Sequence, residues 1–342
     1  MTMKDLTQYP LLKHNTFGID AKCDRFIEFT NDAEAIEAAH ALSQTTSPYL
    51  ILGGGSNLLL TGDYHGTVAH SAIKGIQPQR QYDGDILLRV GSGENWDQLV
   101  AHCVAQGWHG MENLSLIPGD VGASAVQNIG AYGSEAKDLI IRIEAIDIHT
   151  GRPTTIQAAQ CDYSYRHSKF KAQWRNRFLI THVTYRLYTS RFRPVTTYGN
   201  VRQALSSRGI HNPTPQDMRQ LIIDIREEKL PDPKTLGNGG SFFMNPIVPN
   251  ATYQRLAARH PDMPHFDMPD GTVKIPAGWL IEQCGWKGKA MGRAAVHAKQ
   301  ALVLVNLGGA TGAEVLALCQ AIRASVSQQF GIDIQPEVNI IQ

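Results

Sequence analysis

The stretch IPGDVGASAVQNIGAYG, residues 117–133, decides how this sequence is interpreted. Its four glycines, one proline and several small residues surround the polar side chains of Gln127, Asn128 and Tyr132. Such a segment has too little apolar bulk to form a core and too much glycine to form a regular helix, so we expect its backbone to approach a ligand closely. We interpret it as a loop that cradles a cofactor.

Length and composition set the outer limits. A chain of 342 residues exceeds the size at which a single core usually stops growing, which predicts two or three domains. With 42% hydrophobic and 18% charged residues, the composition is that of an ordinary globular protein. The formal net charge of +1 gives no general attraction to nucleic acid or to an anionic membrane, so local groups must bind any anionic ligand.

Cysteine and histidine spacing gives no sign of a disulfide framework or a metal site. The five cysteines are odd in number, widely separated and form no CxxC pair, and the histidines show no HExxH spacing. No run approaches the roughly 18 apolar residues of a membrane span, and the polar start lacks the apolar segment of a signal peptide. We therefore expect a cytoplasmic protein without a metal.

A second glycine-rich segment follows a predicted strand. The apolar residues YLIL, 49–52, run directly into GGGSN, 53–57. Glycine-rich backbone at a strand end can direct several amide groups at one anion, and a diphosphate is a common ligand of such loops. The segment is not a GxGxxG motif, because Leu58 holds the last position, and a tight turn is the alternative interpretation.

Capping residues and apolar periodicity divide the rest of the chain. We expect helices capped at Asn31, Asn95 and Thr311, and a helix that starts near Thr214 and ends before the two prolines at 231 and 233. These prolines mark a domain boundary. The prevalence of strands without a Rossmann crossover predicts an α+β fold. The runs that predict strands are 26–29, 49–52, 66–69, 86–96 as a strand and a turn, 139–148 with a bulge near Ala145 and Ile146, 177–187, 301–306 and 332–341.

Two further segments combine aromatic, polar and cationic side chains. CDYSYRHSKFK, 161–171, is either part of a site or a surface connection, and RPVTTYGN, 193–200, is either a mobile flap or a hairpin end. A third dense glycine segment, LGNGGSFFMNP at 236–246, carries Ser241 and Asn245.

Together with neighbouring residues, these motifs occur in a specific order: NTFGI at 15–19, LGGGSN at 52–57, residues 117–133, YSYRHSKF at 163–170, KLPDPKTLGNGGSFFMNP at 229–246, AGWLIEQCG at 277–285 and QPEV at 335–338. The ordered set resembles the UDP-N-acetylenolpyruvoylglucosamine reductase family, flavoenzymes that complete UDP-N-acetylmuramate in bacterial cell-wall synthesis. The resemblance covers nearly the whole chain. The segment near Tyr198 resembles the subclass with an extra tyrosine loop over the substrate.

The resemblance implies a flavin fold of the vanillyl-alcohol-oxidase type with FAD held between two lobes, 1–75 and 76–230. A third domain, 231–330, would bind the substrate, and the C-terminal strand, 331–342, would return to the second lobe. We expect a monomer that takes NADPH and a UDP-sugar, with no nucleic-acid or membrane partner.

Catalytic roles follow from the same resemblance and from the chemistry of an enolpyruvyl ether. Hydride addition to its terminal carbon drives negative charge toward the carboxylate, which the forked cation Arg166 suits. Glu337 matches the family's catalytic glutamate, and Ser241 matches its proton donor. Taken singly, each residue would more often be an ordinary surface or turn residue.

The remaining predicted site residues are transferred position by position. Ala123, Ala125 and Met244 depart from the commoner family pattern, and Met244 removes a possible cation near the diphosphate. His297 and Trp279 are interpreted as structural. Predicted substrate contacts are Tyr165, Tyr198, Lys229, Asn245 and Gln300. Predicted cofactor contacts are Gly53, Gly54, Gly55, Ser56, Asn57, Pro118, Gly119, Gly122, Ser124, Gln127, Asn128, Gly130, Ala131, Tyr132, Gly133 and Arg226.

The sequence therefore predicts an NADPH-dependent FAD enzyme that reduces UDP-N-acetylglucosamine enolpyruvate during peptidoglycan precursor synthesis. Two other functions stay open at this point. One is a flavin oxidase of the same fold acting on a small alcohol, although GGGSN lacks the histidine through which many such oxidases tether FAD. The other is a non-catalytic UDP-sugar binding protein, which would not need FAD.

Overall fold

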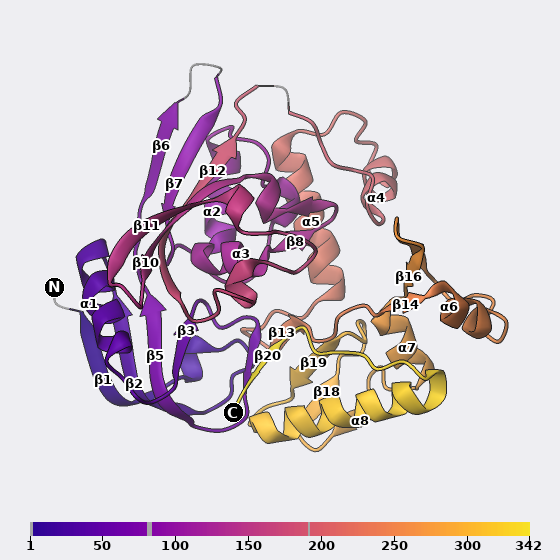
Figure 1. The fold of residues 1–342 in the computed structure, drawn as a ribbon. Coiled ribbons are helices and arrows are strands. Elements are labelled where there is room, and N and C mark those ends of the chain that lie inside the picture. Colours follow the sequence, from indigo (N-terminus) through magenta and orange to yellow (C-terminus); the bar gives the residue numbers. More distant parts are fainter. Residues whose placement is uncertain (1–2, 81–83, 191) are drawn as a thin grey trace. The chain divides into compact units, whose positions relative to one another are not determined.

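The computed structural model describes residues 3–80, 84–190 and 192–342, so the first two residues of the predicted first lobe lie outside it. The chain forms two compact units, which are described separately below (Figure 1). Unit 1 contains residues 1–9, 23–54 and 65–228, and unit 2 contains residues 10–22, 55–64 and 229–342.

The first part of unit 1 is a four-stranded sheet with one helix. Helix α1 begins after Asn31, whose side chain accepts a hydrogen bond from the backbone N–H of Glu34, as its capping sequence predicts. Strand β3 runs parallel to β5, and YLIL is confirmed as a strand. In sheet order, the elements are β1 (Lys4–Pro10), β2 (Lys22–Phe29), β5 (Tyr64–Ser71) and β3 (Tyr49–Leu52), with α1 at Asp32–Ser43.

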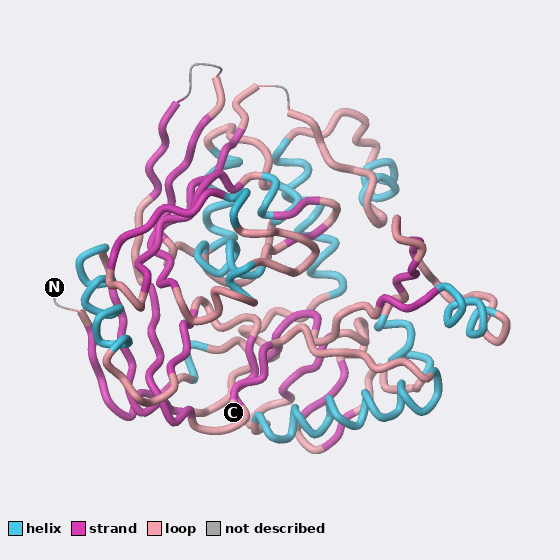
Figure 2. The backbone as a smooth tube through the Cα atoms, viewed as in Figure 1, coloured by secondary structure: helices cyan, strands magenta, loops and turns pink. Residues whose placement is uncertain are grey.

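The second part of unit 1 is a five-stranded antiparallel sheet. Its two longer strands, β10 and β12, shift register between Glu144 and Ala145, which confirms the predicted bulge. Figure 2 shows the helices that accompany these strands. In sheet order, the strands are β11 (Arg152–Gln157), β10 (Ile140–Asp147), β12 (Phe178–Leu187), β7 (Ile86–Gly91) and β6 (Ile76–Arg80). The helices are α2 (Trp96–Ala105), α3 (Val121–Gln127), α4 (Val201–Ser207) and α5 (Pro215–Lys229).

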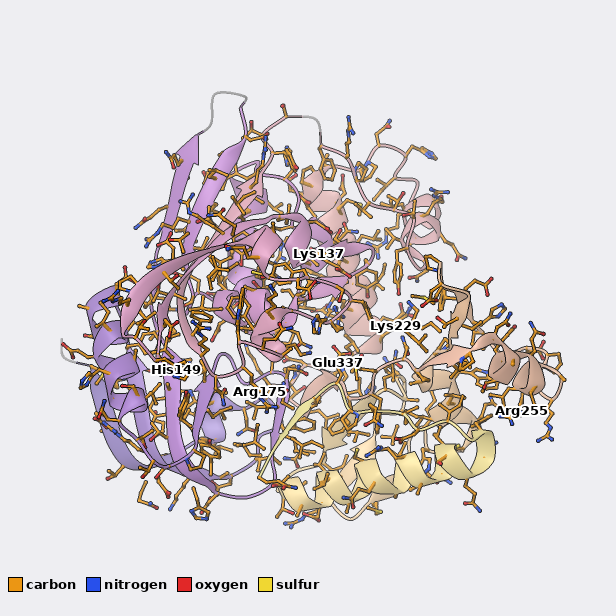
Figure 3. The ribbon with its side chains drawn as sticks, viewed as in Figure 1. Lys137, His149, Arg175, Lys229, Arg255 and Glu337 are labelled. Carbon is orange, nitrogen blue, oxygen red and sulfur yellow. The ribbon has the colours of Figure 1, made fainter. Side chains whose placement is uncertain are left out.

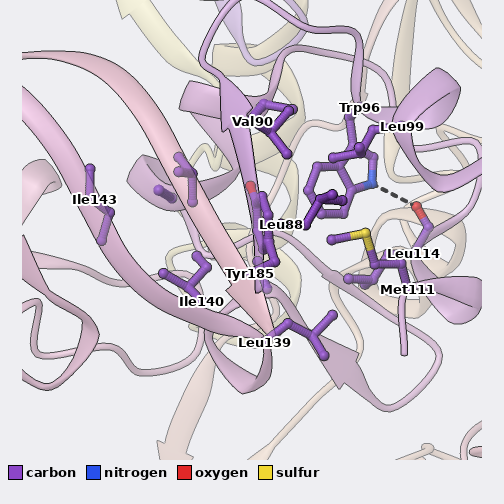
Figure 4. Packing of buried hydrophobic residues seen from close by; sticks show 14 of the residues in the cluster. Leu88, Val90, Trp96, Leu99, Met111, Leu114, Leu139, Ile140, Ile143 and Tyr185 are labelled. Carbon is purple, nitrogen blue, oxygen red and sulfur yellow. Dashed lines mark hydrogen bonds between the residues drawn. The ribbon is translucent and has the colours of Figure 1, made fainter. Parts of the chain in front are cut away.

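The second sheet has a large core of its own. Trp96 and Tyr185 are fully buried at its centre with their rings 5.8 Å apart, and Trp96 Nε1 donates to the carbonyl of Leu114 (Figure 4). Cys103 on α2 is buried in this core, as its helical spacing predicts. Burial of each large apolar side chain stabilises the fold by about 1.5–3 kcal/mol. The strands of the second sheet, against which α3 of residues 117–133 packs, are therefore firmly anchored.

A separate apolar cluster joins α4 and α5. The predicted apolar face of α5 is confirmed, because Met218, Leu221, Ile222 and Ile225 are all buried. The ring of Tyr132 packs against this cluster. The end of residues 117–133 thus rests on the helical part of unit 1.

Unit 2 contains a four-stranded sheet, a three-stranded sheet, a pair of strands described below, and three α-helices. Helix α8 begins at a capping box in which Thr311 and Glu314 bond reciprocally, and it ends at Gly331, which has a φ of +67°. One sheet has the order β13 (Gly237–Ser241), β19 (Val303–Asn306), β18 (Ala294–Val296) and β17 (Ala290–Met291), and the other has the order β14 (Ile247–Pro249), β16 (Thr272–Lys274) and β15 (Phe266–Asp267). The helices are α6 (Asn250–Ala257), α7 (Ala277–Gln283) and α8 (Gly312–Phe330).

The C-terminal strand pairs differently from the prediction. Strand β20 (Asn339–Ile341) runs parallel to β4 (Leu58–Leu60) in unit 2, whereas we expected it to join the second lobe of unit 1. The strand is also shorter than the predicted 332–341. The division of unit 1 into two lobes near residue 75 remains a prediction, with which its two separate sheets agree.

The cysteines, the helices and the possible metal ligands are considered in turn. All five cysteines are free, and only Cys284 is not fully buried. Among the described residues, no helix has both the length and the apolar character needed to cross a membrane. The same part of the chain contains no group of three His, Cys, Asp or Glu side chains arranged to hold a metal.

Candidate active site

The two glycine-rich segments touch each other in unit 1. Gly53 and Gly54 follow the end of β3, and a Cβ atom added to Gly54 would lie 2.8 Å from the Cα atom of Gly119. A Cβ atom on Gly53 would lie 3.1 Å from that of Ala123. Glycine allows the two backbones to pack this closely, and glycine-rich backbone of this kind can direct amide groups at a dinucleotide. The observed geometry therefore fits FAD.

The rest of the GGGSN segment belongs to unit 2. Gly55 has a φ of +65°, and a Cβ atom there would lie 1.9 Å from the carbonyl oxygen of His14. The carbonyl of Asn57 accepts bonds from the backbone and side-chain nitrogens of Asn339, at 3.1 and 3.0 Å. The side chain of Asn57 donates to the carbonyl of Glu337 at 3.5 Å. Residues predicted to hold the cofactor and a predicted catalytic residue are thus neighbours in unit 2.

The expectation that residues 117–133 contain no regular helix is wrong. Val121–Gln127 form the short helix α3. Only Gly122 of the four glycines lies inside it, packed so closely on Ser92 that an added Cβ atom would lie 2.9 Å from the Cβ atom of that serine. The alanines and valines between the glycines have enough helix propensity for one or two turns. Asn128 ends the helix in a left-handed conformation with a φ of +47°.

Two predicted cofactor residues of this stretch use their side chains inside unit 1. The hydroxyl of Ser124 is buried and bonds to the hydroxyl of Tyr185 and the carbonyl of Val121, both at 2.7 Å. The amide of Asn128 donates to the carboxylate of Glu135 and to the carbonyl of Ser164, both at 2.9 Å. The side chains of Ser124 and Asn128 therefore stabilise the conformation of residues 117–133 through bonds within unit 1. Among the other residues predicted here to contact the cofactor, Pro118, Gln127 and Ala131 are at least partly exposed.

Arg166 is docked against the cofactor stretch. Its Nη2 donates to the carbonyl of Gly130 at 2.8 Å, and its guanidinium lies 5.4 Å from the ring centre of Tyr165. Its backbone has a φ of +53°, which costs a non-glycine residue about 1–3 kcal/mol. Nearby hydroxyls offset that cost, since Tyr163 and Ser168 donate to the carbonyls of α3 at 2.9 and 2.6 Å. The segment 163–170 is therefore fixed against α3 and Gly130, and its role in a site stays a prediction.

Arg226 supplies a second cation near the same stretch. Its Nε is buried and has no hydrogen-bond partner among the described residues. Burial lowers the pKa of Arg226, and Arg166 lowers it further, while Tyr132 and Asp97 oppose the shift. Asp97 itself is bonded to Arg219 at 2.7 and 3.0 Å. A buried guanidinium with an unpaired N–H fits a bound anion or carbonyl, as its predicted position near the flavin requires.

Two of the three predicted catalytic residues lie on adjacent backbone segments of unit 2. Residues 335–337 run antiparallel to 242–244, with Glu337 N donating to Phe242 O at 2.8 Å and Met244 N donating to Gln335 O at 2.9 Å. Ser241 immediately precedes this pairing and is exposed at the end of β13. Figure 3 labels Glu337 on the C-terminal segment. The glutamate and the serine are therefore close in the fold although 96 positions apart in the sequence.

The predicted substrate contacts of unit 2 have mixed environments. Asn245 Oδ1 accepts the backbone N–H of Ala277 at the start of α7, at 2.9 Å, so this side chain also caps a helix. Gln300 Oε1 accepts the N–H of Leu302 at 3.3 Å. Lys229 is exposed (Figure 3). Trp279 packs on His260 and Phe330, which confirms its structural interpretation.

One residue that sequence reasoning missed is Asn113. Its buried side chain donates to the carbonyls of Tyr132 and Val195, both at 2.8 Å. No periodicity or motif singled it out, because it is one polar residue just before a glycine-rich stretch. Only the fold brings its two acceptors together.

Asp120 carries the main electrostatic perturbation beside the glycine segments. Burial raises its pKa to about 6; His70 and Lys74 lower it, and Glu94 raises it. Its Oδ1 would lie 3.2 Å from a Cβ atom on Gly54. A carboxyl at this position is poorly solvated near neutral pH, so its ionised form is disfavoured.

Comparison with known proteins identifies the family. A family model described as FAD binding domain matches residues 23–157, and one described as UDP-N-acetylenolpyruvoylglucosamine reductase, C-terminal domain, matches residues 232–341. A UDP-N-acetylenolpyruvoylglucosamine reductase of Bacteroides fragilis is 53% identical over 335 residues, which cover 98% of this chain and 99% of the relative. The chain belongs to the UDP-N-acetylenolpyruvoylglucosamine reductase family.

Other members agree over similar lengths. The reductase of Burkholderia multivorans is 47% identical over 97% of this chain and 95% of its own length, and that of Chromobacterium violaceum is 45% identical over 100% of both. The crystal structure of the Thermus caldophilus reductase is 21% identical, covers 100% of both chains and has a TM-score of 0.66, which shows a shared fold. The predicted family, its α+β flavin-binding fold and FAD as cofactor are confirmed.

Proposed function

We propose that the protein reduces UDP-N-acetylglucosamine enolpyruvate to UDP-N-acetylmuramate, with NADPH as the electron donor and FAD as the carrier, in peptidoglycan precursor synthesis. The observation that carries the proposal is the pairing of residues 335–337 with 242–244, which brings Ser241 and Glu337 together in a chain of this family.

Bare backbone and one buried cation would hold the cofactor. The backbone amides of the two glycine-rich segments would face the diphosphate, and the unpaired Nε of Arg226 suits an acceptor atom of the flavin. When bound, FAD supplies the hydride that it has accepted from NADPH. The protein must then orient the enolpyruvyl group and stabilise the charge that develops on it.

Arg166 is the proposed stabiliser of that charge. Negative charge moves from the double bond toward the substrate carboxylate as the terminal carbon gains a hydride, and preorganised cations lower the free energy of such a transition state most. The contact with Gly130 and the Tyr165 ring supports this role, because it fixes the guanidinium before substrate arrives. Glu337 would orient a cation or share a proton at the same carboxylate.

Ser241 is the proposed proton donor to the carbon next to the carboxylate. This proton and the hydride together complete reduction of the double bond. A serine hydroxyl is a weak acid and needs a partner that favours proton release. Its exposed position at the end of β13 supports access to substrate.

Each unit carries predicted contacts for the sugar nucleotide. Tyr165 and Tyr198 in unit 1 are exposed aromatic residues, and Lys229 in unit 2 offers a cation to the diphosphate. Asn245 and Gln300 would add polar contacts. Met244 is uncharged and makes no charged contribution to this binding.

We further propose that the protein works as a monomer in the cytoplasm. Its five free cysteines suit a reducing compartment, in which NADPH and nucleotide sugars are also found. Light scattering of the FAD-loaded protein tests the monomer directly.

The proposed reaction has a specific product. The purified protein, loaded with FAD, is expected to oxidise one equivalent of NADPH per flavin by itself and to oxidise NADPH repeatedly only when UDP-N-acetylglucosamine enolpyruvate is present. Mass spectrometry should then detect a product two hydrogen atoms heavier than the substrate. Oxygen-dependent turnover of a small alcohol without that product would instead indicate a flavin oxidase.

A further inference from the structure

The side chain of Asn113 bridges two segments that are far apart in the sequence. Its Nδ2 donates to Tyr132 O and Val195 O, both at 2.8 Å, and the residue is only 4% exposed. Because both neighbours are carbonyl oxygens, only the NH₂ group can face them, which fixes the orientation of the amide. A single carboxamide therefore satisfies two buried acceptors.

The two bridged segments are the cofactor stretch and the segment that carries Tyr198. Gly133, which has a φ of +82°, contacts the segment that carries Tyr198. A Cβ atom added to Gly133 would lie 3.1 Å from both Val195 Cγ1 and Tyr198 Cβ. The hydrogen bond from Asn113 to Val195 O thus holds residues 195–198 against Gly133, and Tyr198 packs on this glycine.

The C-terminal end of the Tyr198 segment is also held near the cofactor stretch, by the apolar cluster of α4 and α5. Three residues after Tyr198, Val201 begins α4 and is fully buried. Val201 belongs to the apolar cluster against which the Tyr132 ring packs. Tyr198 itself is 53% exposed, so its position depends on the anchors on either side of it.

We propose that Asn113 is a positioning residue that holds the Tyr198 segment on the cofactor stretch and thereby sets how tightly the sugar nucleotide binds. The inference rests on the proposed role of Tyr198 as a substrate contact. A segment that is already ordered pays less conformational entropy when ligand binds. If the anchor is lost, only a fraction of molecules present Tyr198 correctly, and the apparent affinity falls by that fraction.

Replacement of Asn113 by aspartate tests the proposal with a side chain of the same shape. The carboxylate of Asn113→Asp removes both donors and faces two carbonyl oxygens, whereas its protonated form restores one donor. We expect KM for the enolpyruvyl sugar nucleotide to rise about tenfold at pH 8, with kcat within about twofold of the wild-type value. The ratio of variant to wild-type KM should fall as the pH is lowered toward 6.

Ser115→Ala is the matched control. Ser115 lies in the same turn, is fully buried, and donates its hydroxyl hydrogen bond to Glu112 O at 2.6 Å, within the turn itself. Its loss perturbs the turn but leaves the bridge intact. We expect wild-type KM at both pH values for this variant.

Limited proteolysis of the FAD-loaded protein gives a readout that does not need turnover. Chymotrypsin should cleave after the exposed Tyr198 about five times faster in Asn113→Asp than in the wild type or in Ser115→Ala, because the released segment opens more often. If wild-type protein fails to turn over the substrate, the proposed function fails, but the cleavage rates still test the anchor.

Asn113→Ser, smaller and uncharged, serves as a second variant that avoids a buried carboxylate, and it should lie between wild type and Asn113→Asp in both measurements. The proposal is overturned if cleavage and KM of the asparagine variants equal the wild-type values. It is also overturned if KM rises equally in Ser115→Ala, or if the rise in Asn113→Asp is the same at pH 6 and pH 8.

Discussion

Replacement of Gly54 by alanine should damage the cofactor site through one defined contact. Its new Cβ atom would lie 2.8 Å from Gly119 Cα, 3.2 Å from Gly119 C and 3.2 Å from Asp120 Oδ1. Ordinary contacts begin at 3.4 Å, and backbone atoms cannot rotate aside as a side chain does. One segment must therefore move by roughly 0.6 Å. Gly54 does not have a positive φ, so this contact is the main cost.

Overpacking of this kind costs about 1–3 kcal/mol. Because 1.4 kcal/mol corresponds to about a factor of ten in affinity, FAD should bind about 5-fold to 150-fold more weakly if the moved backbone is the part that holds the diphosphate. The assay is titration of apoprotein with FAD, followed by quenching of flavin fluorescence, alongside thermal unfolding of the apoprotein.

Gly62→Ala is the matched control, since Gly62 has no atom within 4 Å of its added Cβ position and no positive φ. It should bind FAD as the wild type does. Wild-type FAD affinity in Gly54→Ala would refute the assignment of this contact to the cofactor site. A large fall in apoprotein stability with unchanged affinity would refute it as well.

Three further predictions concern the charged and catalytic groups. Burial raises the pKa of Asp120 from 3.8 to about 6, so between pH 3.8 and pH 6 the folded state binds a proton that the unfolded state has lost. The free energy of unfolding therefore falls as the pH rises through this range and stays low above pH 6. Asp120→Asn should raise the free energy of unfolding at pH 8 by up to about 3 kcal/mol and flatten its pH dependence. Thermal unfolding of both proteins at pH 5 and pH 8 measures this, and equal stability at pH 8 would contradict the prediction. Ser241→Ala should leave flavin reduction by NADPH nearly unchanged but slow reoxidation by the enolpyruvyl substrate about 10²–10⁴-fold in stopped-flow experiments, and equal slowing of both half-reactions would exclude a role limited to proton donation. Arg226→Gln should lower the midpoint potential of the bound flavin by about 30 mV for each 1.4 kcal/mol of lost stabilisation of the reduced form, measured by spectroelectrochemistry, and an unchanged potential would place Arg226 away from the flavin.

The parts of the fold that could be predicted from the sequence are those with local causes. The caps at Asn31, Asn95 and Thr311 each bond to the backbone N–H three residues later, so a short motif determines where the helix begins. The register shift beside Ala145 is equally local, because one extra residue changes the phase of apolar alternation. Such features need no knowledge of the rest of the chain.

Two features of the fold could not be predicted, for different reasons. Helix α3 was missed because the glycine content of residues 117–133 was judged as a whole, although three of its four glycines lie outside the helix. The pairing of β20 with β4 joins residues about 280 positions apart, and nothing in either three-residue strand specifies its partner. Long-range pairing is decided by which edge the completed fold leaves open.

The candidate site shows the same division. Glycine-rich segments can be recognised as ligand loops from composition alone, but the proximity of Ser241 and Glu337 arises from a backbone pairing that no local pattern contains. Their roles were predicted only because the ordered motifs resemble a known family. Asn113 remained unnoticed because its two acceptors, Tyr132 and Val195, are backbone groups whose meeting depends on the tertiary structure.

The most direct test of the proposed function is an anaerobic titration that separates the two half-reactions. The FAD-loaded protein is first bleached with one equivalent of NADPH, and UDP-N-acetylglucosamine enolpyruvate is then added in the absence of oxygen. We predict that the flavin absorbance returns fully, with one UDP-N-acetylmuramate formed per flavin. Flavin that stays reduced until air is admitted would contradict the proposed reductase function.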